Sequence, residues 1–292
     1  MIVSNITLFD TLTAALDGTA SQIQLTEQQL ATGRRVNQPS DDPAAYAQAE
    51  VLSQQSSAIT NDVSIANQVQ SQLSTADNVL SSASNALDSA VQLATQGADA
   101  TISTSQMADL GQQVNALLSQ IISLANSQYN GAYVFSGDKA LTAPYNAAGV
   151  YLGGANSNAV VLSDGTSMQV NFNGQSIFGD ATTGPIGTLT ALAAALNSGN
   201  KTAVAATLPQ LQASIQQIAS ARAGIGTTAN TASAEIMNGN NILVTFLAAI
   251  NNVSGADIAQ TISHFNEQSV QQQALVSLGS ELSKMPLINI LA

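Results

Sequence analysis

Apolar and small residues recur along most of this chain in alternating steps of four and three, the spacing that places one stripe on one side of a helix. Before residue 33 the stripe is half polar and includes Leu8, Leu12 and Leu30. Gly33 suits a helix end, because glycine tolerates the left-handed conformation that closes many helices. The pattern predicts a first helix that is weak without a partner surface.

Three further stripes predict long helices over residues 45–94, 107–124 and 204–250. Thr202 is the expected cap of the third of these helices, and Ser254 with Asp257 resembles the capping box of a last helix. The stripe of this last helix comprises Ile258, Ile262, Phe265, Leu278, Leu282 and Met285.

The pattern changes between residues 132 and 187, which are rich in Gly, Asn and aromatic residues. Met168, Val170 and Phe172 alternate with polar residues, and Asn173-Gly174 is a turn signal. These features predict a small β-rich insert domain over 132–187, between a helical segment at 1–131 and a second helical segment at 188–292.

The helices before the insert and those after it must cover each other's stripes, because the chain offers no other apolar surface. The predicted fold is mainly α: a long antiparallel coiled-coil bundle built from the N- and C-terminal segments. Both chain ends are expected at one end of the bundle and the small β-rich inserted domain at the other.

Composition narrows the function. Charged residues are only 8% of the 292, and the net charge is −12, so a nucleic acid or an anionic membrane surface is an unsuitable partner. The longest apolar run, at 242–250, is too short for membrane insertion. There is no cysteine, and the N-terminus lacks the basic region of a cleaved signal peptide. A surface rich in Ser, Thr, Asn and Gln suits packing against copies or relatives of the same protein.

The stretch NQPSDDPAA at 37–45 is the sharpest break between predicted helices. Ser40, Asp41, Asp42 and Pro43 have the composition of a helix cap, with a proline at the first helical position and negative charge at the helix N-terminus. A metal or acid–base site at the two carboxylates is the alternative, although no His, Cys or third carboxylate lies near in sequence. We predict a cap, no metal and no cofactor.

Arg222 occupies a seam position in an otherwise apolar stripe. It either pairs with a carboxylate and fixes helix register, or packs its stem while its head reaches solvent. Gly224 and Gly226 follow it and permit either a close helix approach or a local bend. His264 is the single histidine, so the chain has no catalytic triad, and we predict that it is not an enzyme.

The run TGRRVNQPSDDPAA at 32–45 resembles the N-terminal signature of the flagellin superfamily, and its SDDP form is similar to the hook-associated protein 3 branch. NGAYVFSGDK at 130–139, RAGIG at 222–226 and the C-terminal helix from SGADIAQ agree with it, in the same order. The resemblance implies a structural part of the bacterial flagellum at the hook–filament junction.

The same resemblance implies an extracellular protein, exported unfolded without a cleaved signal. Its expected partners are a neighbouring hook-associated protein, flagellin, copies of itself and a cytoplasmic export chaperone. Assembly is expected to bury the stripes from Leu8 to Leu30 and from Ile258 to Met285 against neighbours. The alternatives are a short flagellin that forms the filament itself and, from another class, a secreted adhesin that displays the insert.

Overall fold

A computed structural model describes residues 2–284, with side chains from residue 7 to residue 282. Met285, the last residue of the predicted C-terminal stripe, lies outside the described residues. The elements, in chain order, are α1 (Ile2–Thr32), α2 (Pro43–Gly97), α3 (Thr104–Ala125), β1 (Gln128–Tyr129), β2 (Ala132–Tyr133), β3 (Ala159–Val161), β4 (Ser167–Gln169), α4 (Gly174–Phe178), α5 (Gly184–Asn197), α6 (Lys201–Ser254) and α7 (Ile258–Lys284).

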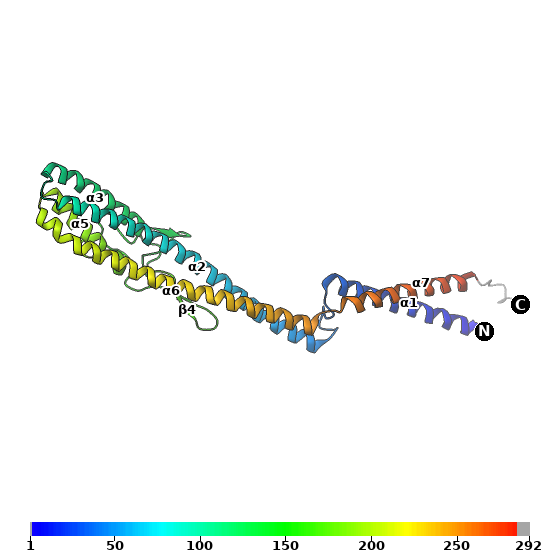
Figure 1. Ribbon diagram of the computed structural model, residues 1–292. Coiled ribbons are helices and arrows are strands. Elements are labelled where there is room, and N and C mark those ends of the chain that lie inside the picture. Colours follow the sequence, from blue (N-terminus) through cyan, green and yellow to red (C-terminus); the bar gives the residue numbers. More distant parts are fainter. Residues whose placement is uncertain (1, 285–292) are drawn as a thin grey trace. The chain divides into compact units, whose positions relative to one another are not determined.

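The chain divides into two compact units, and α2 and α6 contribute to both (Figure 1). The terminal unit consists of residues 1–58 with 241–292, and the central unit of residues 59–240. The mainly α, coiled-coil fold predicted from the heptad spacing is confirmed, and most of the chain lies in the seven helices named above.

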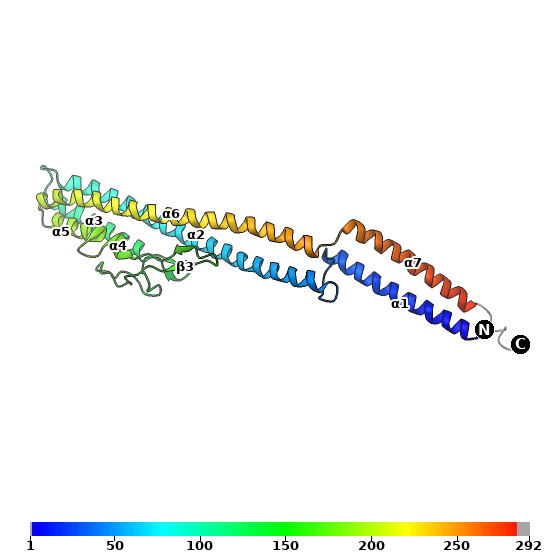
Figure 2. The ribbon, with the colours of Figure 1, turned by 90° about the horizontal axis from the view of Figure 1, so that it is seen from below.

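The hydrophobic core lies in the central unit. Figures 1 and 2 show α3 and α5 running alongside α2 and α6. The stripe of α2 is fully buried at Leu73, Leu80 and Leu87, and it packs with Ile121 of α3 and Leu192 of α5 in one cluster. Burial of this many large aliphatic side chains is the main stabilising contribution to the unit.

The insert packs against the side of α2. The Ser163 backbone N–H and hydroxyl donate to the Asp62 carboxylate at 3.3 and 3.1 Å, and Gln72 Nε2 donates to the Val170 carbonyl at 2.8 Å. The prediction that the insert occupies the end of the bundle is therefore wrong. The reason is that α3 runs back along α2 and delivers the chain beside residues 62–72.

The insert contains less strand than its alternation predicts. Its paired strands are two or three residues long, with β1 antiparallel to β2 and β3 antiparallel to β4. An aromatic cluster stabilises it: the Phe135 ring meets Phe178 edge-on at 5.1 Å, and the buried Tyr145 hydroxyl donates to the Gly179 carbonyl. Packing around these rings, rather than strand pairing, organises the insert.

Two predicted helix caps are replaced by neighbouring residues. The N-terminus of α6 is capped by Asn200, whose Oδ1 accepts from the Ala203 N–H at 3.0 Å, so the prediction of Thr202 is wrong. The cap of α7 is Asp257 alone, which accepts from the Gln260 N–H at 3.1 Å. Ser254 is still inside α6 and donates to the Ile250 carbonyl. Ser254 therefore ends α6 and does not cap α7.

Arg222 pairs with a carboxylate and also reaches the surface. Its Nε and one terminal nitrogen donate to the two Asp77 carboxylate oxygens at 2.8 and 3.1 Å, a bidentate ion pair between α6 and α2. The two side chains are 39% and 42% exposed, so water screens the pair. Each interpretation of this seam residue therefore describes part of the observed geometry.

We expect Arg222→Met and Asp77→Asn to be coupled by about 0.5–1 kcal/mol in the free energy of unfolding, the range for a well-formed but screened pair. A double-mutant cycle by urea denaturation measures this coupling. Asp88→Asn, further along α2, is the control and should be additive with Arg222→Met. A coupling near zero for Arg222 with Asp77 would show that the pair does not contribute to stability.

Candidate functional site

The terminal unit is built on an antiparallel pair of helices, α1 and α7, which lie side by side in both views (Figures 1 and 2). The seam of this pair is polar. Leu12, Thr19 and Thr26 of α1 are buried at heptad spacing, and Thr261 is the buried residue of α7. A Cβ added at Gly279 would lie 3.3 Å from Leu12 Cδ2, so the helices are close at that level.

The buried threonine hydroxyls are satisfied mainly within their own helices. Thr19 donates to the Ala15 carbonyl and Thr261 to the Asp257 carbonyl, each at 2.7 Å. Thr26 Oγ1 lies 3.0 Å from Gln268 Oε1, a polar contact between the two helices. These contacts remove the penalty of burying hydroxyls, but they replace apolar burial that would hold the pair together.

The predicted assembly residues fall into two groups in this pair. Leu12 is buried in the seam, while Leu30, Phe265 and Leu282 are half-buried beside it. The other four side chains remain exposed: Leu8, Ile258, Ile262 and Leu278. Sequence reasoning missed Thr261 and Gln268 as seam residues, although both continue the four–three spacing through Phe265 and Leu282.

The terminal unit also contains two connections at which the helices are interrupted, one between α1 and α2 and one between α6 and α7. The α1–α2 connection pairs with the α6–α7 connection through an antiparallel bridge between Arg34 and Gly255. The Arg35 N–H donates to the Ser254 carbonyl at 2.7 Å, and the Ala256 N–H donates to the Gly33 carbonyl at 3.0 Å. Gly33 has φ of +67°, which a residue with a side chain rarely adopts. We call residues 33–42 together with 253–257 the helix break.

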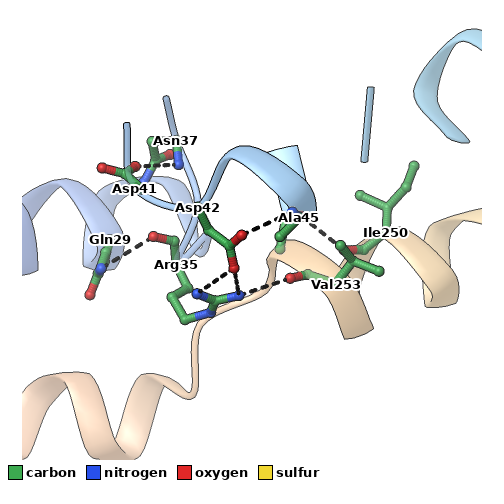
Figure 3. Close-up of polar contacts among 9 residues, drawn as sticks. Gln29, Arg35, Asn37, Asp41, Asp42, Ala45, Ile250 and Val253 are labelled. Atoms are coloured by element: carbon green, nitrogen blue, oxygen red, sulfur yellow. Dashed lines mark hydrogen bonds and ion pairs between the residues drawn. The ribbon is translucent and has the colours of Figure 1, made fainter. Parts of the chain in front are cut away.

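The acidic pair closes the turn in the helix break (Figure 3). Asp41 Oδ2 accepts from the backbone N–H groups of Asn37 and Gln38 at 2.8 and 3.0 Å. Asp42 Oδ1 accepts from the Ala45 N–H at 3.0 Å, the geometry of an N-cap with Pro43 as the first helical residue. Ser40 lies exposed in the turn before them. The two carboxylates therefore have different tasks: one closes the turn and the other starts α2.

Arg35 links the acidic pair to the second chain segment. Its guanidinium donates to Asp42 Oδ2 at 3.4 Å and to the Val253 carbonyl at 3.2 Å, and Gln29 Nε2 donates to the Arg35 carbonyl (Figure 3). Sequence reasoning did not single out Arg35, although a basic pair shortly before an acidic pair is a visible signal. One side chain thus contacts both the α2 cap and the end of α6.

Hydrogen bonds to the charged form lower the pKa of both carboxylates. The N–H groups of Asn37 and Gln38 lower the pKa of Asp41, and the Ala45 N–H followed by the Arg35 guanidinium lowers the pKa of Asp42. Carboxylates held ionised in this way suit capping. Within residues 2–284 no three His, Cys, Asp or Glu side chains come together in a way that could hold a metal ion.

Residues 3–140 match the family described as the bacterial flagellin N-terminal helical region. This segment is therefore similar to the flagellin N-terminal region. The match includes α1, the loop between α1 and α2, and the helices α2 and α3, so the acidic pair lies inside it. The resemblance of TGRRVNQPSDDPAA to the flagellin superfamily is therefore confirmed.

Curated relatives are similar to this chain over part of its length. The chain is 32% identical over 162 residues to flagellar hook-associated protein 3 of Escherichia coli K12, an overlap of 54% of this chain and 51% of that protein. The chain thus spans about half the length of the curated relatives it matches.

Two solved structures share the fold. A structure from Vibrio parahaemolyticus, named as a flagellar hook-associated protein, is 22% identical with a TM-score of 0.68, over 74% of this chain and 100% of that one. The flagellar junction protein FlgL of Legionella pneumophila is 18% identical with a TM-score of 0.57, over 71% and 99%. No helix of residues 2–284 is both long and apolar enough to cross a membrane.

We expect Asp42→Ala to lower the Tm of the chain by about 2 °C, because it removes the cap of α2 and the partner of Arg35 together. Asp42→Asn is the matched variant, since asparagine caps a helix well but cannot form the ion pair. Calorimetry should show a smaller loss for Asn than for Ala. Equal losses would mean that the ion pair, and not the cap, is what matters.

The helix break should also be less stable in acid. Because the folded-state pKa of Asp41 and Asp42 is lowered, their stabilisation is complete above the ordinary aspartate pKa of about 4 and is lost as the pH falls through it toward the lower folded value. The Tm, measured by calorimetry, should therefore fall more steeply between about pH 4 and pH 2 in the wild-type chain than in Asp41→Asn/Asp42→Asn, which has no carboxylate at either position to titrate. Equal pH dependence of the Tm in the two proteins contradicts the assignment.

Proposed function

We propose that this chain is a structural, non-enzymatic subunit of the bacterial flagellum, placed at the junction between the hook and the filament. The observation that supports this most directly is the terminal helix pair, which belongs partly to a flagellin N-terminal region and has a polar seam with apolar side chains left outside. Its partners are copies of itself, a neighbouring hook-associated protein and flagellin.

Assembly proceeds by coupled folding. The seam of α1 and α7 buries Thr19, Thr26 and Thr261 where a self-sufficient coiled coil would bury leucine, so the pair is weak by itself. Neighbouring subunits supply the missing burial by covering exposed side chains such as Phe9, Ile258 and Ile262. The price of ordering the helices is met only when those neighbours are present.

Export and location follow the same proposal. The chain leaves the cell unfolded, without a cleaved signal peptide, and an export chaperone protects the terminal helices in the cytoplasm. A weak α1–α7 pair suits such a route, because a marginal helix pair unfolds at little cost. The mature subunit is extracellular.

The nearest alternative is a short flagellin, which would form long filaments by itself. The likeness to hook-associated protein 3 over 162 residues favours the junction protein. A secreted display module would instead require terminal helices that are stable without neighbours, and the polar α1–α7 seam disfavours it.

The deciding experiment uses a flagellated bacterium from which its own hook-associated protein 3 has been deleted. Expression of this chain should restore filaments and swimming, whereas Ile262→Lys should not, because a charge at this 46%-exposed position opposes packing by neighbours. Val161→Lys, at an exposed position of the insert, is the matched control and should restore motility. Both variants must be secreted at the wild-type level.

Three outcomes contradict the proposal. Failure of the wild-type chain, with secretion intact, excludes the junction role. Long filaments formed by the purified chain alone under salting-out conditions identify a flagellin instead. A small, stable oligomer whose residues before 33 and after 257 resist proteolysis identifies a display module.

A further inference from the structure

One segment of α6 in the central unit is built from residues that form helices poorly. Residues 223–231 read AGIGTTANT, with two glycines, three threonines and an asparagine in nine positions. Glycine is the least favourable helix residue after proline, and threonine and asparagine rank low. The segment is nevertheless continuous helix. Tertiary packing, and not local preference, therefore holds it.

No close packing requires the two glycines. A Cβ built at Gly224 or at Gly226 meets no atom within 4 Å, and neither residue has a positive φ. Gly239 of the same helix is the opposite case, since its Cβ would lie 2.4 Å from Val63 Cγ2 of α2. Close approach thus explains Gly239 but excludes that explanation for Gly224 and Gly226.

The threonines weaken the same stretch of helix. Thr227 Oγ1 donates to the Ala223 carbonyl at 3.0 Å, Thr228 to the Gly224 carbonyl at 3.3 Å, and Thr231 to the Thr227 carbonyl at 3.2 Å. Such bonds to the preceding turn share carbonyls with the backbone ladder and favour bending of the helix. Soft positions therefore follow one another for more than two turns.

Firm contacts bracket the soft stretch. On one side Arg222 is fixed to Asp77 by two hydrogen bonds. On the other side Gly239 lies against Val63. Between them Ile225 and Ala232 remain buried. The helix is thus anchored before and after the segment, and between the anchors the packing of these two side chains, without support from helix propensity, opposes bending.

We propose that residues 223–231 are a hinge in α6, which lets this helix change curvature between two fixed points without leaving α2. In an assembly, as the proposed function requires, the hinge lets one subunit fit between neighbours of different spacing. This second half rests on the proposed function, whereas the compliance of the segment does not.

Hydrogen exchange measured by mass spectrometry on the full chain tests the compliance. Amides of 223–231 should exchange at least tenfold faster than those of 211–221 and 232–240. Gly224→Ala/Gly226→Ala should slow this exchange by about tenfold, because each substitution improves helix propensity and meets open space. Gly18→Ala, also in open space but in α1, is the control and should leave 223–231 unchanged. Equal exchange across α6, or no slowing in the double variant, overturns the hinge.

The assembly role has its own test in the motility strain of the preceding section. The double alanine variant should be secreted normally yet restore less swimming than the wild-type chain, and Val161→Lys in the insert should restore it fully. Wild-type motility in a variant that exchange shows to be stiff overturns the assembly role and leaves the hinge standing. If the wild-type chain itself fails to restore motility, the proposed function fails, and the exchange result still decides the hinge.

Discussion

A helix with one apolar stripe can bury those side chains only against another helix, and this requirement determines how the whole chain folds. With so few aromatic residues, burial comes from Leu, Ile, Val and Ala in narrow seams, so each helix needs a partner along its length. Within the terminal unit, α1 and α7 come from opposite ends of the sequence. Both helices must therefore be synthesised before either has its partner.

The two units meet this constraint to different degrees. In the central unit, α3 and α5 cover the seams of α2 and α6, and Leu73, Leu80 and Leu87 are fully buried. In the terminal unit, among the residues that the structure describes, α1 packs against α7, and threonines occupy much of the buried seam. The same coiled-coil spacing thus produces an apolar core in one unit and a largely polar seam in the other, which is what the proposed assembly requires.

The helix break stabilises the terminal unit where apolar burial is small. Its bonds come from the backbone bridge of Arg34 and Gly255, from the Asp42 cap and from Arg35. All these groups are partly exposed, so each contributes modestly, but together they fix where α1 ends and α2 begins. Turn closure by Asp41 and capping of α2 by Asp42 account for the two adjacent carboxylates at this position.

The sequence predicts the helices well because the four–three spacing persists over long stretches. It also predicts Asp42 beside Pro43 at the start of α2, since composition and position agree there. It fails where tertiary contacts decide: Asn200 and Asp257 replace the predicted caps, and the return of α3 moves the insert beside Asp62. The polar α1–α7 seam and the Asp77 partner of Arg222 depend on which helix faces which, and spacing alone does not reveal that.

If the proposed function holds, the terminal helices are only marginally stable until neighbours cover them. Hydrogen exchange of the purified, full-length, unassembled chain tests it most directly, through the backbone amides of α1 and α7 against those of α2 between residues 73 and 87. This marginal stability predicts exchange at least a hundredfold faster in α1 and α7. Equal protection in the two sets of amides would contradict it, because the terminal pair would then be stable without any neighbour.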